Sequence, residues 1–197
     1  MTIDPTTFSL TALGDMPAVA QEILHFWFVK TTPEQRFAKD PDFDAEIQQR
    51  FGGIMQELSD GLYKDWLSSS GGALASCIAL DQFTRNVYRD TPESFACDEI
   101  AREIACYLRD HEVHTLLPDS WRMFCFLPFM HSENLDDQVE CIRLGQEHIA
   151  NEMFGSYAEK HRVIIARFGR FPHRNAILGR VSTPEELTFL QEPNSSF

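Results

Sequence analysis

Apolar residues recur at three- and four-residue steps along most of this chain, which is the spacing of one face of an α-helix. The clearest stripe consists of Phe43, Ile47, Phe51, Ile54 and Leu58. No segment shows the sustained two-residue alternation and β-branched enrichment of a half-buried strand. The pattern predicts an all-α protein of about eight or nine helices, joined by short loops into antiparallel hairpins with a tetratricopeptide-like rhythm.

Capping signals mark several helix ends. Residues 32–35 read Thr-Pro-Glu-Gln, which supplies a cap, a proline at the first helical position and a glutamine that can reach back to the cap. Residues 40–41 (Asp-Pro) and 183–184 (Thr-Pro) predict two more helix starts of the same kind. Residues 156–159 (Ser-Tyr-Ala-Glu) match a capping box and predict that a late helix begins there, and Gly169 suits its left-handed end.

The segment 73–88 begins as an apolar helix and ends in a polar patch. Leu74 and Ile78 are followed on the same face by Asp81 and Arg85. Neighbouring rows of the same helix carry further polar residues, namely Gln82, Asn86 and Arg89. An apolar face that runs into charged residues is typical of a site mounted on a core.

A nearly continuous apolar segment, residues 121–130, predicts a buried helix or turn, because it is too short to cross a membrane. A further apolar stripe follows it and traces another helical face, which comprises Leu135, Val139, Ile142, Ile149 and Met153. Both segments add to the expected helical layers.

Length and composition fit one globular domain over residues 1–197, with residues 1–16 as a polar leader. The chain is 43% hydrophobic and contains 16 Phe and 3 Trp, which is enough apolar surface to build a sizeable core. Its five cysteines are widely spaced and form no C-x-x-C pair, so neither a zinc ribbon nor a disulfide scaffold is indicated.

A formal net charge of −13 argues against a broad surface for nucleic acid or for anionic membranes, because both need positive charge. The first residues lack the charged and apolar regions of a signal peptide, and no apolar run approaches the roughly 18 residues of a membrane span. The sequence therefore predicts a cytoplasmic protein without nucleic-acid or membrane partners.

One stretch departs from this negative charge, since residues 160–180 contain six Lys or Arg residues and no Asp or Glu. Two unit charges about 4 Å apart interact with roughly 4 kcal/mol at an effective dielectric of 20, so its arginines cannot converge without compensation. One interpretation is an internal ion network with Asp81, Glu133, Asp136 and Asp137. The other is capture of a ligand carboxylate or phosphate, which guanidinium groups bind bidentately. Both hold at once if the network leaves one guanidinium free.

His131 and Glu133 directly follow the apolar segment and are candidates for acid–base chemistry, together with His161 and His173. A carboxylate beside a histidine raises the histidine pKa, and a nearby arginine lowers it. No metal site is predicted, because the spacing matches no zinc motif. The structural alternative is that Glu133 accepts N–H groups at the start of the following helix, with His131 as a loop anchor.

Three blocks of the chain carry a resemblance to a known family. Residues 80–89 read Leu-Asp-Gln-Phe-Thr-Arg-Asn-Val-Tyr-Arg, residues 127–133 read Leu-Pro-Phe-Met-His-Ser-Glu, and residues 167–175 read Arg-Phe-Gly-Arg-Phe-Pro-His-Arg-Asn. Together they resemble DUF924, a bacterial family of unknown function, over residues 20–190. The resemblance implies an all-helical, tetratricopeptide-like fold and brings no established activity.

The chain departs from this family pattern at two positions. Thr84 stands where the family commonly has proline, and Asn134 stands where it commonly has aspartate. The second difference weakens any role for an acidic pair formed by Glu133 with its neighbour.

Two functional hypotheses from different classes follow. In the first, a polar pocket binds a small anionic metabolite and processes it by histidine-mediated acid–base chemistry. The catalytic candidates are His131, Glu133 and His173. The ligand-binding candidates are Asp81, Gln82, Arg85, Asn86, Arg89, His161, Arg167, Arg170, Arg174, Asn175 and Arg180. In the second, a tetratricopeptide-like surface binds a protein or peptide, and the polar motifs are structural. The sequence indicates no cofactor class and no oligomeric state, and it leaves open whether the protein is an enzyme.

Overall fold

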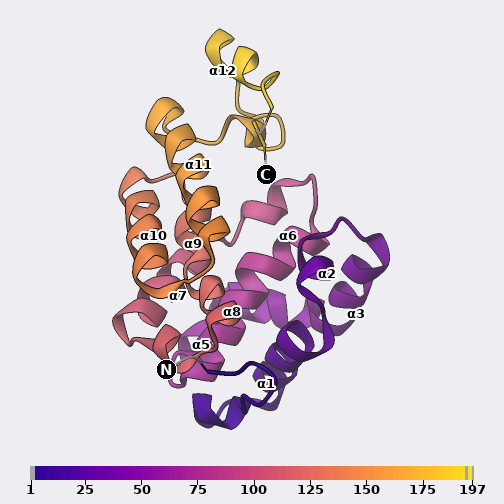
Figure 1. Ribbon diagram of the computed structural model, residues 1–197. Coiled ribbons are helices and arrows are strands. Elements are labelled where there is room, and N and C mark those ends of the chain that lie inside the picture. Colours follow the sequence, from indigo (N-terminus) through magenta and orange to yellow (C-terminus); the bar gives the residue numbers. More distant parts are fainter. Residues whose placement is uncertain (1–2, 194, 197) are drawn as a thin grey trace.

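The computed structural model describes residues 3–193, 195 and 196, and every regular element in that part of the chain is helical (Figure 1). The α-helices are α1 (Ala18–His25), α2 (Pro33–Phe37), α3 (Pro41–Glu57), α4 (Tyr63–Trp66), α5 (Ser70–Cys77), α6 (Thr84–Val87), α7 (Asp98–Asp110), α8 (Asp119–Arg122), α9 (Leu127–His131), α10 (Leu135–His148), α11 (Glu152–Phe168) and α12 (Pro184–Phe189). The all-α prediction is confirmed, whereas the tetratricopeptide-like arrangement stays a prediction.

Shorter helical turns connect these helices. The 3₁₀ turns are η1 (Leu10–Leu13), η5 (Pro92–Phe95), η6 (Val113–Leu116), η7 (Met123–Cys125) and η8 (Pro172–Arg174), and the π-turns are η2 (Phe26–Lys30), η3 (Leu58–Leu62) and η4 (Ile78–Phe83). Each π-turn follows an α-helix without a break, and η4 joins α5 directly to α6. The η2 turn ends its helix at an extended Thr31, whereas η3 and η4 are each followed directly by another α-segment. Such interruptions contribute to a larger number of α-segments than the eight or nine helices expected.

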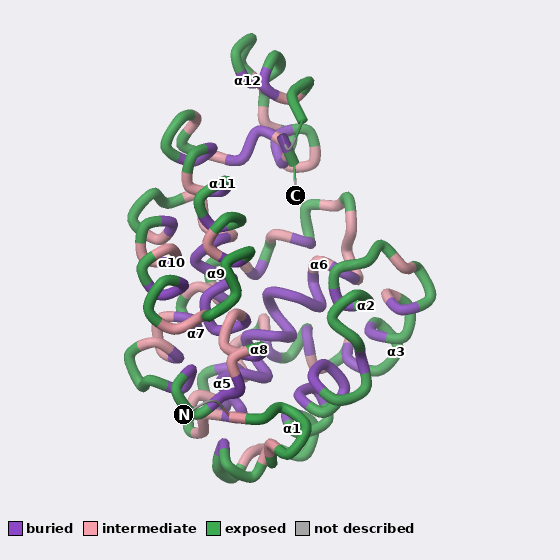
Figure 2. The backbone as a smooth tube through the Cα atoms, in the orientation of Figure 1, coloured by how far each residue is buried: buried purple, intermediate pink, exposed green. Residues whose placement is uncertain are grey.

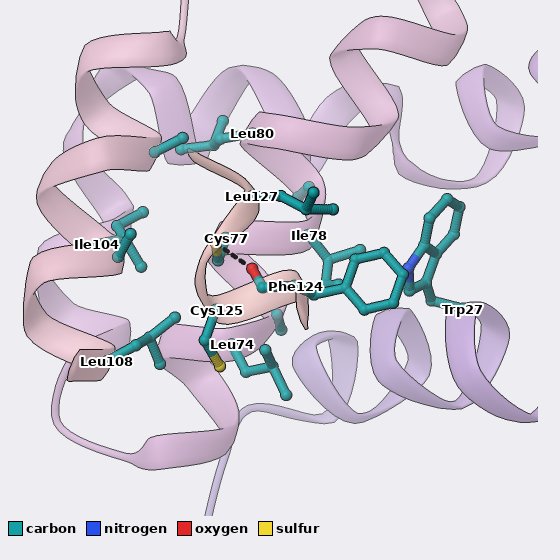
Figure 3. Packing of buried hydrophobic residues seen from close by; sticks show 14 of the residues in the cluster. Trp27, Leu74, Cys77, Ile78, Leu80, Ile104, Leu108, Phe124, Cys125 and Leu127 are labelled. Atoms are coloured by element: carbon teal, nitrogen blue, oxygen red, sulfur yellow. Dashed lines mark hydrogen bonds between the residues drawn. The ribbon is translucent and has the colours of Figure 1, made fainter. Parts of the chain in front are cut away.

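Most of the apolar side chains form one large core, which extends from the first helices to Phe154 and Ala158 on α11. Figure 3 shows its centre, where α5 and η4 meet α7 and the segment that contains Phe124. The Trp27 and Phe124 rings meet edge to face with centroids 5.8 Å apart, and the Cys77 thiol donates to the Phe124 carbonyl over 3.4 Å. Full burial of each such aromatic side chain contributes about 1.5–3 kcal/mol.

A separate, smaller cluster holds the end of the chain. Ile164 and Ile165 on α11 pack with Phe171 and Phe189, and Phe168 lies partly buried against them. In Figure 1 the segment after α11, including α12, stands beyond the end of the helical body. We call residues 169–193 the C-terminal lobe. Figure 2 shows buried backbone where this lobe begins, although most of its remainder is exposed.

Local capping signals are largely confirmed. Thr32 with Gln35 and Thr183 with Glu186 form reciprocal capping boxes, and the Asp40 side chain accepts two backbone N–H groups at the start of α3. Gly169 ends α11 with φ 67°, a left-handed conformation that glycine adopts without steric cost.

The predicted helix start at residues 156–159 is wrong. The α11 helix begins at Glu152, one residue after Asn151, whose side chain accepts the N–H of Met153 over 2.9 Å. Ser156 therefore lies within the helix. Asparagine is an equally good cap, and it places the start one turn earlier than the capping-box match.

Only part of the apolar stripe expected along α10 packs against the core, namely Ile142 and Ile149. Leu135 and Val139 are exposed, and Met153 near the start of α11 is exposed as well. The buried positions of α10 are instead Gln138, Cys141, Leu144 and Gly145. Gln138 is buried because its side-chain amide donates to the carbonyls of residues 129, 130 and 132, which a sequence pattern of apolar residues cannot reveal.

No helix among the described residues is long and apolar enough to cross a membrane.

Candidate functional site

A surface pocket of about 330 Å³ lies where η5 and α7 meet the end of α9 and the C-terminal lobe. Its lining combines apolar and charged residues. Its lining consists of Pro92, Phe95, Ala96, Asp98, Glu99, Arg102, His131, Ser132, Glu133, Arg174 and Leu178. Three of the residues proposed from the sequence, His131, Glu133 and Arg174, thus line one pocket.

Asp81 is not part of the pocket lining but contacts His131, which is. It lies in the π-turn η4 and is buried, as Figure 2 shows for the surrounding backbone. Its Oδ1 is 2.7 Å from Nδ1 of His131, the last residue of α9. π-turns in α-helices are frequent at functional sites, because the wider turn redirects a side chain. Here the redirected carboxylate meets the imidazole of a residue fifty positions later.

The protonation states of this pair follow from their surroundings. Burial alone would raise the pKa of Asp81, but His131 and Arg85 outweigh it and lower that pKa to about 2. Burial and the nearby Arg85 charge lower the pKa of His131, although Asp81 opposes them. At neutral pH we therefore assign an ionised Asp81 and a neutral His131 that donates from Nδ1.

This tautomer leaves Nε2 of His131 as a hydrogen-bond acceptor. The structure gives Nε2 no hydrogen-bond partner among the described residues, and the side chain lines the pocket. A neutral imidazole held by a buried carboxylate, in a residue that lines a cavity and with its other nitrogen available as an acceptor, has the arrangement of a general base.

A chain of ion pairs extends from Asp81 along the pocket. Arg85 lies 3.2 Å from Asp81 and 2.8 Å from Asp98, and Asp98 also pairs with Arg174 at 2.9 Å. Two guanidinium groups thus alternate with two carboxylates, and the chain is electrically balanced. The acidic partner of Arg174 comes from the first turn of α7, where a carboxylate is also favoured by the helix dipole.

Arg174 is the most buried arginine of the C-terminal lobe. Its guanidinium lies between the rings of Phe95 and Phe171, 4.5 and 4.6 Å from their centroids. One terminal nitrogen donates to Asp98 and the other donates to the His131 carbonyl over 3.0 Å. Each terminal nitrogen has two N–H groups, so one on each is left without a partner among the described residues.

Glu133 fastens the lobe to the end of α9. Its two oxygens accept from Arg180 at 2.6 and 2.9 Å, and one of them also accepts the backbone N–H of Phe171 at 2.7 Å. Burial would raise the pKa of Glu133, but the bonds from Arg180 and Phe171 lower it. The expectation that Glu133 caps the following helix is wrong, because Asn134 caps α10. Since asparagine caps as well as aspartate does, the Asn134 departure costs this helix start little.

These features can be compared with known proteins. Residues 23–194 match the family described as a bacterial protein of unknown function, DUF924. The chain belongs to the DUF924 family. It is also similar to a protein of unknown function, ATU0120 from Agrobacterium tumefaciens, with 36% identity and a TM-score of 0.84 over 90% of this chain and 99% of that one. No curated protein matches it.

Two arginines of the acid-free stretch lie outside the pocket of this DUF924 protein. Arg167 pairs with Glu185 at 2.9 Å, and Arg170 makes a bidentate pair with Glu186 at 2.7 and 2.8 Å. Both partners lie in the first turn of α12. The expected convergence of the arginines at one site is therefore wrong for these two. Their carboxylate partners come from α12, eighteen residues after Arg167 and sixteen residues after Arg170.

Other predicted ligand-binding residues also have internal partners. Asn86 and Arg89 both bind the Asp44 carboxylate on α3, which the Arg89 side chain contacts at 2.6 and 3.1 Å. The Gln82 amide donates to Asp81, and the Asn175 amide donates to Ser182 and, more weakly, to Glu186. The structure does not bring these side chains to the pocket.

His161 on α11 and His173 in η8 of the lobe are not part of the pocket lining. The Phe171 ring contacts both imidazoles, with its centroid 5.6 Å from that of each. Burial lowers the pKa of His161 to about 3 and, together with Arg174, the pKa of His173 to about 4. Both imidazoles are therefore neutral near pH 7 and add no positive charge to the arginines.

Ser132 and the buried cysteines of this DUF924 protein are poor nucleophiles. The Ser132 hydroxyl donates to Asp137 over 2.6 Å and makes no hydrogen bond to His131. Burial raises the pKa of the Cys77 and Cys125 thiols, so their reactive thiolate forms are disfavoured. Among the described residues, no group of three or more His, Cys, Asp or Glu side chains is placed to hold a metal ion.

Sequence reasoning missed the residues of α7 and η5 that complete the site. Asp98 and Glu99 are acidic residues in a first helical turn, where the helix dipole alone explains them. Arg102 pairs with Glu99 three positions earlier, which is also an ordinary helix-surface pattern. Phe95 follows the Thr-Pro pair at 91–92, and that pair was a usable signal that a new turn begins beside the site.

Proposed function

We propose that the pocket binds a small anionic metabolite and that His131 removes a proton from it. The observation that supports this function is the pairing of His131, a residue of the pocket lining, with the buried Asp81 through Nδ1, which leaves Nε2 without a hydrogen-bond partner among the described residues. An ionised Asp81 fixes the imidazole tautomer and stabilises the imidazolium that forms when Nε2 accepts a proton. A positioned general base of this kind contributes about 10²–10⁴-fold to a reaction rate.

Two arginines supply the anion-binding groups in this proposal. Arg174 has one unused N–H on each terminal nitrogen, and the two aromatic rings hold its guanidinium plane in place. Arg102 lines the same pocket and is one-third exposed. Because Asp98, Glu99 and Glu133 also line the pocket, the ligand must place its anionic group close to the guanidinium donors and away from these carboxylates.

Anion binding can be tested with a thermal-shift screen of carboxylated and phosphorylated metabolites, since a ligand that prefers the folded state raises the unfolding midpoint. Arg102→Gln should abolish the shift produced by a bound anion. The matched control is Arg162→Gln, because Arg162 forms the same exposed pair with a glutamate three residues earlier and is 32% exposed against 33% for Arg102. A shift that persists in Arg102→Gln, or no shift for any anion, would rule out the binding site.

Proton transfer is tested separately, with any ligand that this screen identifies. His131→Gln should retain binding and lose turnover, measured as product formed by mass spectrometry. In the wild type, the rate should fall with decreasing pH around a midpoint below the ordinary histidine pKa, because the pKa of His131 is lowered by burial and by Arg85. Full turnover in His131→Gln would remove the catalytic role and leave a binding protein.

A peptide-binding function is the second candidate, and a shallow apolar groove supports it. The groove has a volume of about 230 Å³ and is lined by Glu159, Lys160, Val163, Ile164 and Phe189, between α11 and α12. This function predicts that Val163→Lys, which places a charge in the apolar groove, abolishes capture of an apolar peptide while anion shifts are absent. Peptide capture that is unaffected by Val163→Lys would rule out this groove as the peptide-binding site.

A further inference from the structure

The exposed stripe on α10 has the spacing of a helix–helix seam. Leu135, Val139, Ile142 and Gln146 follow one another at four-, three- and four-residue steps. This heptad spacing keeps a row of side chains facing a second helix. Leu135 is 43% exposed and Val139 is 53% exposed, while Ile142 is partly buried.

Of this row, only Ile142 packs against the chain's own core. The α10 helix already contacts α9 and α11 through its other face, which carries Gln138, Cys141, Leu144 and Gly145. The approach to α11 is close, because a side chain added at Gly145 would meet the Phe154 ring at 2.7 Å. The exposed row is therefore an additional apolar surface, and α10 lies at the edge of the molecule in Figure 1.

We propose that two copies of this chain form a dimer in which their α10 helices pack antiparallel across a two-fold axis. In that arrangement Val139 of one copy lies opposite Ile142 of the other, and Leu135 lies opposite Gln146. A two-fold interface requires a surface that is complementary to itself, and a row with apolar residues on both sides of its midpoint meets that requirement.

Charged residues beside the row also favour a second copy of this chain as the partner. Asp136, Glu140, Arg143 and Glu147 lie on one flank of the stripe, with two acids toward the helix start and the arginine beyond the midpoint, where it pairs with Glu147. An antiparallel pair places Arg143 of each copy against Asp136 and Glu140 of the other. Arg143 already pairs with Glu140 and Glu147 of its own helix, whereas Asp136 has no ion-pair partner among the described residues.

The size of the contact predicts a weak dimer. The 14 residues of α10 span about 21 Å. A single helix pair of that length lies at or below the roughly 1,200 Å² that marks the lower end of specific interfaces. Each copy also has a formal charge of −13, and the resulting repulsion is screened by salt. We expect a dissociation constant on the order of micromolar at about 0.15 M ionic strength.

Sedimentation equilibrium of the full chain over a range of concentrations tests the dimer. The wild type should rise from the 22.6 kDa of one chain toward twice that mass. Val139→Glu should weaken association by about tenfold or more, because it places a charge in the apolar row. The matched control is Val29→Glu, since Val29 is 56% exposed on η2 and lies outside the row. A wild type that stays monomeric, or equal weakening by both variants, would overturn the proposal.

A charge exchange tests the antiparallel orientation. Arg143→Glu should weaken association, and the double variant Arg143→Glu with Asp136→Arg should recover most of it, because the opposite charges again meet across the interface. Circular dichroism of each variant verifies that the helices are formed. Failure of the double variant to recover association, with the fold intact, would exclude this arrangement.

Discussion

Arg170 and Arg174 lie four positions apart in one loop, and their guanidinium groups bind carboxylates from distant parts of the chain. Arg170 binds Glu186, sixteen residues later, and thereby holds α12 within the C-terminal lobe. Arg174 binds Asp98, seventy-six residues earlier, and joins the lobe to the helical body. The same residue type in one basic stretch therefore serves two structures, and the choice depends on which acid the fold brings near.

The two pairs also differ in their surroundings. Arg174 is buried between two aromatic rings, and its carboxylate is shared with Arg85 beside the pocket. Arg170 is partly exposed, although its partner Glu186 is buried and also accepts the Thr183 N–H. Removing a cation from a buried network costs more than removing one from a solvated pair, and this difference can be measured.

The largest effect is expected from Arg174→Ala. It removes the stacked guanidinium and leaves the Asp98 carboxylate with Arg85 as its only remaining cation among the described residues. We expect the free energy of unfolding to fall by about 3 kcal/mol, the lower end for a broken buried pair. Urea denaturation at pH 7 measures this change. A loss below about 1 kcal/mol would show that the burial of Arg174 contributes little to stability.

An intermediate effect is expected from acid, through His161. Its folded pKa of about 3 lies below the ordinary histidine value, so the unfolded state binds the proton first and stability decreases as the pH falls below about 6.5. The loss is about 1.4 kcal/mol per pH unit in this range, or about 2 kcal/mol at pH 5. Urea denaturation at pH 7 and pH 5 should show a smaller pH-dependent loss for His161→Gln than for the wild type. Equal losses would contradict a neutral buried His161.

The smallest effects are expected in the lobe. Arg170→Ala should destabilise the lobe more than Arg167→Ala does, because it leaves the buried Glu186 without its bidentate cation. Arg167→Ala should cost less than about 1 kcal/mol, since Arg167 and Glu185 are both well exposed. Hydrogen exchange of the α12 amides measures both variants, and Arg167→Ala serves as the matched control. Equal protection of the α12 amides in the two variants would show that the Arg170–Glu186 pair holds α12 no more strongly than the Arg167–Glu185 pair does.

Features set by neighbouring residues could be predicted from the sequence. The caps at Thr32, Asp40 and Thr183 and the glycine end at Gly169 depend on contacts within a few positions. The start of α11 was misplaced because two polar residues in that region can both cap a helix, and only packing of the first turn selects Asn151.

Features set by distant residues could not be predicted in the same way. The ion network was one of the two readings of the basic stretch, and Glu133 was correctly among its acids. Asp98 and Glu186 were not, because a partner across the fold leaves no mark in local spacing. The row on α10 was read as one more helical face, and an apolar pattern does not tell whether the covering surface belongs to the same chain or to another.

The π-turn η4 has a consequence for how this chain tolerates change. Deleting one residue within Ile78–Phe83 would convert the wide turn into an ordinary α-helical turn, and the helix itself would remain continuous. Every later side chain of that helix would rotate by about 100° relative to those before it. Asp81 and Arg85 would then no longer share a face with the residues they now contact. Loss of a single codon would thus remove the contacts that hold His131 and Asp98 in the pocket lining, while the helix is preserved.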